Sequence, residues 1–210
     1  MMTYSKSHRL YLLLSAGVIL FGVILGLLGR GQIQLIPGMA SGGSIHFRAL
    51  LTFTYQSNLL LVVGFLAMSM ISENKVRHYI SVSVMLATTV TGLVYNFVLV
   101  PFGGAPMFFS NYVNFSTHVL AMALPLANYI IFEKKGFLTR LHILAAMIFP
   151  GLYWAVFVSL GERINFAPYF FMNPAQVGWP SVILWFVMFL AFFAGLGFLL
   201  ILFDRCRGTK

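Results

Sequence analysis

The stretch ALLTFTYQSNLLLVVGFLAMSMI, Ala49–Ile71, combines the length of a membrane span with a polar cluster near its start. About 20 predominantly apolar residues suffice to cross a bilayer core, and most of the polar residues here are gathered between Thr52 and Asn58. Polar side chains are costly in lipid and usually face the interior of a helix bundle or a cavity. This stretch therefore predicts a transmembrane helix that lines a polar space.

Five further stretches have a similar length and apolar character. The chain of 210 residues is 60% hydrophobic and only 8% charged, with a mean hydropathy of +0.92, whereas a soluble domain carries about 25% charged residues. We therefore predict an all-α polytopic membrane protein in which residues 1–210 form one six-helix transmembrane bundle. The predicted spans are residues 10–29, 49–71, 79–100, 112–132, 138–160 and 179–203.

The basic residues fall mostly on one side of the predicted membrane. Three lie on the opposite side, namely Arg30, Arg48 and Arg163. Ten lie on the first side, namely Lys6, Arg9, Lys75, Arg77, Lys134, Lys135, Arg140, Arg205, Arg207 and Lys210. An excess of Lys and Arg marks the cytoplasmic side, so we expect a multi-pass protein of the cell membrane with both termini cytoplasmic. The net charge of +9 then reflects topology, and we expect no nucleic-acid partner.

The polar residues of three predicted spans share one depth and one helix face each. Thr54, Ser57 and Asn58 stand at i, i+3 and i+4, a spacing that places side chains together on a helix. The other two sets are Asn111, Asn114 and His118, and Thr89, Gly92 and Asn96 with its neighbour Tyr95. We expect these faces to meet around one cavity in the outer half of the bilayer.

The cytoplasmic half carries fewer polar candidates. Three histidines lie among its basic residues, and we expect them to be solvated or to face lipid headgroups: His8, His78 and His142. On the outer side, the segment Phe166–Pro174 is too aromatic for a free solvated loop, and we expect it to dip into the membrane interface, where aromatic rings prefer to sit.

A hydroxyl beside a histidine is the minimum for nucleophilic catalysis, because the imidazole can accept the hydroxyl proton. Thr54 or Ser57 could serve as the nucleophile and His118 as the base, with the amides of Asn58, Asn96 and Asn114 stabilising an oxyanion. The same residue types also hold transmembrane helices together through hydrogen bonds, so a purely structural role is the alternative. His46, His118 and Glu162 show no metal-ligand spacing, and we predict neither a metal nor a cofactor.

Several of these motifs resemble those of a known family. The segment Phe53–Leu60, reading FTYQSNLL, resembles the FT-x-Q-SN-LL signature of the bacterial six-span Pr-six-Pr family, and three further segments fall in the matching order. These are Thr91–Asn96, His118 followed by Pro125, and Pro168–Pro174.

The chain is also remotely similar to the androgen-induced membrane proteins of animals, which hydrolyse fatty-acid esters with an intramembrane Thr and His. That resemblance implies Thr54 as the nucleophile, with Thr52 as a near alternative, and His118 as the base. Phe170 stands where those proteins have Pro in their outer loop.

Three functions follow as expectations. The first is a threonine-type intramembrane hydrolase of lipid or fatty-acid esters, with Thr54 and His118 as catalytic residues. Its substrate would be bound by Ser57, Asn58, Tyr95, Asn96 and Asn114. The second is a non-enzymatic binder or carrier of an amphipathic small molecule in the same pocket, and the third is a structural membrane subunit.

Overall fold

The computed structural model describes residues 5–28, 49–103, 105, 107, 111–161, 163 and 166–208. Every regular element in this part of the chain is helical. Six helices are long and apolar enough to cross a membrane, which confirms the predicted all-α six-helix architecture. The main α-helical parts of these six are α1 (Lys6–Leu27), α3 (Phe53–Met70), α4 (Lys75–Val94), α7 (Ala121–Phe132), α8 (Arg140–Gly161) and α10 (Trp179–Arg207).

Shorter elements extend two of the spans and cover one end of the bundle. They are η1 (Tyr95–Leu99), α5 (Val100–Gly103), α6 (Tyr112–Phe115), η2 (Ser116–Leu120), η3 (Phe170–Met172) and α9 (Pro174–Val177). α4 continues through η1 and α5 into one unit that is long and apolar enough to cross a membrane, and α6, η2 and α7 form another.

The helix starts follow from capping residues. α3 begins at Phe53 rather than at Ala49, because the Thr52 side chain accepts a hydrogen bond from the Tyr55 backbone N–H and caps the helix. In the same way the Asn74 side chain accepts from the Arg77 N–H, so α4 begins at Lys75, four positions before the predicted start of that span. Caps of this kind are local, and they move the ends of the spans without changing their number.

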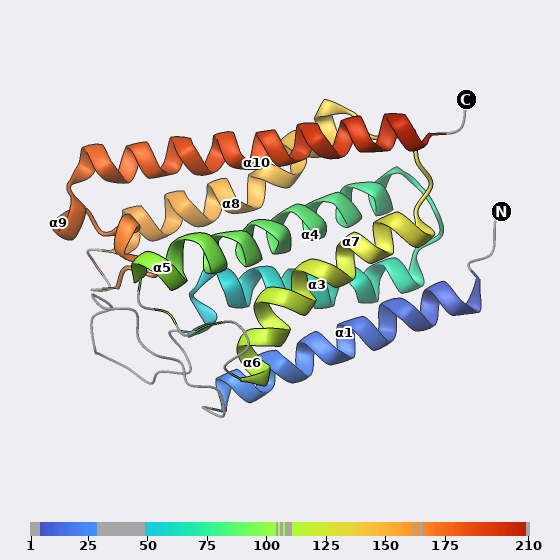
Figure 1. The fold of residues 1–210 in the computed structure, drawn as a ribbon, viewed down its shortest axis with the longest axis horizontal. Helices are drawn as coiled ribbons and strands as arrows, with labels where there is room; N and C mark the ends of the chain where they lie inside the picture. Colours follow the sequence, from blue (N-terminus) through green and yellow to red (C-terminus); the bar gives the residue numbers. More distant parts are fainter. Residues whose placement is uncertain are drawn as a thin grey trace.

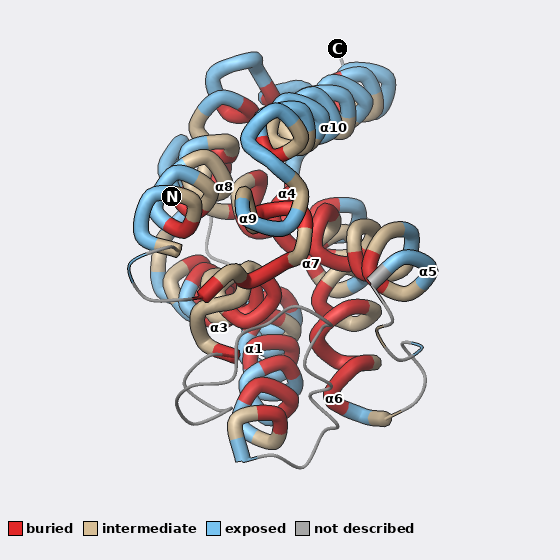
Figure 2. Tube along the Cα trace, turned by 90° about the vertical axis from the view of Figure 1, so that its left-hand side faces the viewer, coloured by how far each residue is buried: buried red, intermediate tan, exposed pale blue. Residues whose placement is uncertain are grey.

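α4 lies at the centre of the bundle. It packs against α3 and α7 on one side and against α8 and α10 on the other, as Figure 1 shows. Figure 2 shows the buried residues gathered in this inner region and the exposed ones along α10. Both chain ends lie at the same end of the bundle (Figure 1), as an even number of spans requires.

The end of the bundle that holds the chain termini contains a buried polar network. His8, His78 and His142 are 5%, 9% and 7% exposed, so the prediction that they are solvated or face headgroups is wrong. His8 Nε2 donates to Asn128 Oδ1 at 2.8 Å, and His78 Nδ1 lies 3.5 Å from the Glu133 carboxylate. These partners lie far from the histidines in the sequence. The position of the histidines among basic residues therefore led to a wrong prediction.

The opposite end is closed by aromatic packing. Phe166, Tyr169, Phe171 and Met172 are all buried and pack with Tyr153 of α8 in one cluster. The expectation that the segment Phe166–Pro174 is not a free solvated loop is confirmed. This segment folds onto the ends of α3, α8 and α10, and it forms one wall of the site described next.

Candidate functional site

Two π-helical turns lie in neighbouring spans at the end of the bundle away from the chain termini. They are η1 and η2, and three of the predicted site residues lie within them: Tyr95 and Asn96 in η1, and His118 in η2. A π-helical turn is an uncommon interruption of an α-helix that is frequently found at functional sites. No sequence signal considered above indicates these turns.

His118 is buried, with 6% of its surface exposed. Its Nδ1 lies 3.1 Å from the Asn114 carbonyl oxygen, which can only accept, so we assign the ring proton of the neutral histidine to Nδ1. Nε2 is then an acceptor, and it makes no hydrogen bond with any residue that the structure describes. The ring stacks on Tyr95, with ring centroids 3.5 Å apart.

A glycine allows η2 to approach α4 this closely. A Cβ atom placed on Gly92 would lie 2.5 Å from the His118 backbone oxygen, a distance at which atoms clash. Any larger residue at position 92 must therefore push the two spans apart. Gly92 thus marks a close contact between α4 and η2.

Ser57 and Asn58 connect α3 to its neighbours. The Ser57 hydroxyl lies 2.8 Å from the Thr91 hydroxyl of α4. The Asn58 amide nitrogen donates to the backbone oxygens of Thr54, at 2.7 Å, and of Thr117 in η2, at 3.0 Å. These bonds hold three helices together, which is the structural role weighed for such residues in the sequence.

Two amide oxygens near these contacts have no hydrogen-bond partner within the described residues. They are Asn58 Oδ1 and Asn96 Oδ1. The Asn96 nitrogen donates to the Gly92 carbonyl at 2.7 Å, and Asn114 is buried beside the cap formed by Asn111. The three predicted polar faces lie on adjoining helices, and the expectation that they surround one cavity stays a prediction.

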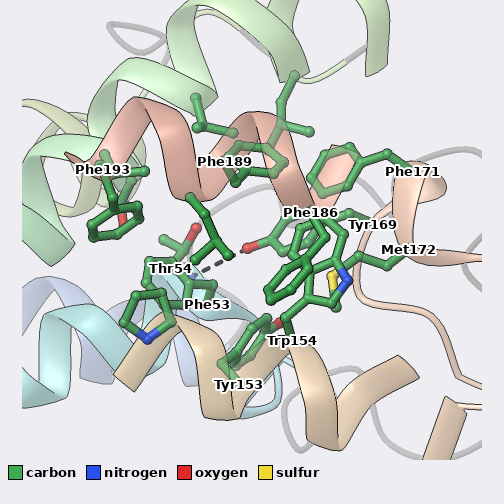
Figure 3. A pocket seen from close by; sticks show the side chains of 16 residues that line it. Phe53, Thr54, Tyr153, Trp154, Tyr169, Phe171, Met172, Phe186, Phe189 and Phe193 are labelled. Carbon is green, nitrogen blue, oxygen red and sulfur yellow. Dashed lines mark hydrogen bonds between the residues drawn. The ribbon is translucent and has the colours of Figure 1, made fainter. Parts of the chain in front are cut away.

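A cavity opens on the α8 and α10 side of Thr54 (Figure 3). The space open to the centre of a water molecule is about 60 Å³, several times the roughly 10–15 Å³ that one water requires. It is lined by Phe53, Thr54, Val90, Thr91, Val94, Leu99, Pro150, Tyr153, Trp154, Tyr169, Phe171, Met172, Phe186, Phe189, Leu190 and Phe193. We call this cavity the aromatic pocket.

Of the seven predicted site residues, Thr54 lines the aromatic pocket. The other six lie outside its wall: Ser57, Asn58, Tyr95, Asn96, Asn114 and His118. No hydrogen bond joins the Thr54 and His118 side chains in the described part of the chain. Asn58 nevertheless bridges the backbone of Thr54 to that of Thr117, the residue before His118, so the predicted pair sits on adjoining segments.

Tyr169 is a pocket residue that sequence reasoning did not select as part of the site. Its phenol oxygen accepts a hydrogen bond from the Thr54 backbone N–H at 3.3 Å, drawn as a dashed line in Figure 3. Burial raises the pKa of Tyr169 above its ordinary value, against the opposing hydrogen bonds of Thr54, so the phenol keeps its proton at neutral pH. The aromatic composition of the segment Phe166–Pro174 was the signal in the sequence that could have indicated Tyr169.

Two residues weighed as metal ligands, His46 and Glu162, lie outside the described residues. No model of a known protein family matches the chain, and neither does any curated protein or any solved structure. The aromatic pocket and the two π-helical turns are thus the basis for a functional assignment.

Proposed function

We propose that this protein is a multi-pass membrane protein that binds an apolar or amphipathic small molecule in the aromatic pocket. The observation that carries the proposal is the composition of the pocket wall. Eight of the 16 lining residues are aromatic, and none carries a formal charge at neutral pH: the aromatic residues are Phe53, Tyr153, Trp154, Tyr169, Phe171, Phe186, Phe189 and Phe193. Small-molecule sites are typically apolar and aromatic with a few placed polar groups.

The surroundings of the pocket support a ligand that comes from the membrane. α8 and α10, which supply much of the pocket wall, are the two spans least buried inside the protein. Aromatic rings offer large contact areas and favour offset or edge-to-face stacking with other rings. A ligand with an apolar body therefore gains packing contacts there, and it needs few polar groups.

Photolabelling of the full chain in lipid nanodiscs tests this proposal. The probe is an aryl trifluoromethyl diazirine with a dodecyl chain, and its sites of attachment are mapped by mass spectrometry. Leu190→Trp, which places a ring in the pocket wall, should reduce labelling of pocket residues several-fold. The matched control is Leu184→Trp on the same helix, because Leu184 is 60% exposed; it should leave pocket labelling unchanged. Labelling spread evenly over exposed faces in all three proteins would contradict the proposal.

Hydrolysis of a lipid ester in the same pocket is the second candidate. The three possible nucleophiles differ in the hydrogen bonds of their hydroxyls and in their position relative to the pocket, and this difference favours Thr54. The Thr52 hydroxyl donates to the Ala49 carbonyl at 2.7 Å, and Ser57 is bonded to Thr91. Of the three residues only Thr54 lines the pocket, where its side chain is hydrogen-bonded to the Tyr169 phenol. The resemblance to the androgen-induced membrane proteins implies the same residue.

In this mechanism His118 Nε2 takes the proton from the Thr54 hydroxyl as the oxygen attacks the ester carbonyl. The carbon–oxygen bond to the alcohol then breaks, and the alcohol leaves with the proton from His118. Water attacks the acyl-threonine in the second half of the reaction, which releases the acid and restores the hydroxyl. A rearrangement must first bring Nε2 within hydrogen-bond reach of the Thr54 hydroxyl.

A lipophilic fluorophosphonate distinguishes the two candidates. A hydrolase should be labelled in the wild type and lose its label in both Thr54→Ala and His118→Ala, while Ser57→Ala retains it. Thermal unfolding of each variant shows whether it is folded. A wild type that takes no label and cleaves no ester across a broad lipid panel leaves binding as the function.

A further inference from the structure

The wall of the aromatic pocket is not equally buried on all sides. Thr54 of α3 and Thr91 of α4 are buried, and so are Phe171 and Met172 at the end of the pocket away from the chain termini. Apart from Phe53 and Val94, the partly exposed residues of the wall lie on α8 and α10: Pro150, Trp154, Phe186, Phe189 and Leu190. The pocket is therefore least enclosed along the line where α8 and α10 meet, which we call the α8–α10 seam.

The half of this seam nearer the chain termini is tightly packed. A Cβ atom placed on Gly197 of α10 would lie 2.5 Å from Cγ2 of Ile143 on α8, so the two helices are in close contact there. Ile143, Ala146 and Phe193 are buried in one cluster in this half. Close packing of this kind resists separation, so this half of the seam is expected to stay closed.

The other half of the seam is closed by aromatic rings. The centroid of the Trp154 ring on α8 lies 5.5 Å from that of Phe186 and 5.4 Å from that of Phe189 on α10, and Figure 3 shows these rings at the pocket. No hydrogen bond joins α8 to α10 among the residues that the structure describes. Ring contacts lack the fixed geometry of hydrogen bonds between helices, so these side chains can part and close again with little rearrangement.

Pro150 separates the two halves of the seam on α8 and lies one turn before Trp154. α8 continues through it from Arg140 to Gly161. Because proline has no backbone N–H, the Ala146 carbonyl lacks its helical partner, and helices bend preferentially at such positions. The part of α8 that carries Trp154 can therefore tilt away from α10 while the part that carries Ile143 stays in place.

We infer that the α8–α10 seam is a lateral portal, which opens when α8 bends at Pro150 and Trp154 separates from Phe186. A hydrocarbon chain of a membrane molecule enters the aromatic pocket through it. Every exposed residue from Leu141 to Val156 on α8 and from Ile183 to Leu202 on α10 is apolar, so the portal would open into lipid. This inference rests on the proposed binding function and adds the route of entry and the source of the ligand.

A reversible cross-link across the seam tests the inference. Trp154→Cys and Phe186→Cys are combined with Cys206→Ser in the full chain, and the two thiols are joined by a bis-methanethiosulfonate. Entry of the diazirine probe is followed in nanodiscs by irradiation at set times after the probe is added. We expect the cross-link to slow labelling of pocket residues several-fold, and reduction to restore the rate. The two single-cysteine variants, which carry the reagent without a cross-link, should keep their rates.

A second variant tests the bend in α8. Pro150→Ala supplies the missing N–H to the Ala146 carbonyl, so opening must break one more hydrogen bond. Labelling should slow roughly 2- to 10-fold, the range that one net hydrogen bond provides, and should reach the wild-type level at long times. The matched control is Pro125→Ala, which changes a proline inside α7 and outside the pocket wall. It should keep the wild-type rate.

The outcomes separate the portal from the pocket. A cross-link that leaves the rate of labelling unchanged overturns the portal, while pocket binding stands. A cross-link that slows entry, together with an unaffected Pro150→Ala, overturns Pro150 as the hinge. If the double-cysteine variant does not fold, Pro150→Ala decides alone, and an unchanged rate overturns the inference. If the wild-type pocket takes no label, pocket binding fails and the inference fails with it.

Discussion

The Arg77 guanidinium and the Glu133 carboxylate lie 3.6 Å apart inside the protein, with 1% and 2% of their side chains exposed. Arg77 also donates to the backbone oxygens of Met68 and Ile71 at the end of α3. Glu133 accepts from the Asn128 amide at 3.1 Å, and Asn128 in turn accepts from His8 of α1. One buried ion pair thus connects four helices at the end of the bundle where the chain begins and ends.

Removing one partner of this pair should destabilise the protein strongly. Arg77→Met leaves the Glu133 carboxylate buried without its main cationic partner, and the loss of a buried partner costs about 3–5 kcal/mol. Unfolding measured in detergent checks this value. Lys134→Ala is the control, because its pair with Glu73 is 48% and 28% exposed and such pairs contribute about 0–1 kcal/mol. An equal loss of unfolding free energy in both variants would show that the buried pair contributes no more to stability than the exposed pair.

The same pair should make stability depend on acid pH. Burial alone would raise the pKa of Glu133, but the hydrogen bond with His78 and the charge of Arg77 outweigh it and hold the pKa below 4.5. A carboxyl whose pKa is lowered by folding contributes stability above its unfolded pKa and loses it as the pH falls through the folded value. The advantage of wild type over Glu133→Gln, measured as melting temperature, should therefore shrink as the pH falls below 4.5. An advantage that stays constant over this range would contradict the assignment.

α4 lies so close to η2 at Gly92 that we expect no side chain to fit at this position. Gly92→Ala places a Cβ atom 2.5 Å from the His118 backbone oxygen, and a forced clash of this kind costs about 1–3 kcal/mol. The control is Gly151→Ala, where the added atom meets nothing within 4 Å, so the higher helix propensity of Ala should leave stability unchanged or slightly raised. Thermal unfolding compares the two variants. A neutral Gly92→Ala would mean that the two spans are not held at this distance.

The uneven distribution of basic residues predicts the orientation in the membrane. Reporters fused at residue 3 or 208 should be cytoplasmic, and reporters inserted at residue 40, 105 or 172 should lie on the opposite side. Reporter enzymes that are active on only one side of the membrane measure this. A cytoplasmic signal at residue 105 would reverse the orientation and would place the aromatic pocket in the inner half of the bilayer.

The helical architecture could be predicted because it depends on properties read along the chain. The second span illustrates this, since its apolar length specified a membrane-crossing helix and only its start, at Phe53, required the cap formed by Thr52. The contact faces of Ser57 and Gly92 were also predictable from helical spacing. In contrast, His8 was misplaced, because its partner Asn128 is distant in sequence.

The all-α class and the six helices long and apolar enough to cross a membrane could be read along the chain, because apolar length and helical periodicity are local properties. Which helix faces meet depended on the packing of the whole bundle. It placed Thr54 against Tyr169 in an aromatic pocket, left His118 in a π-helical turn outside that pocket, and paired Arg77 with Glu133. These contacts depend on how six helices pack and on where a connecting segment folds back, and no spacing within a single helix encodes either.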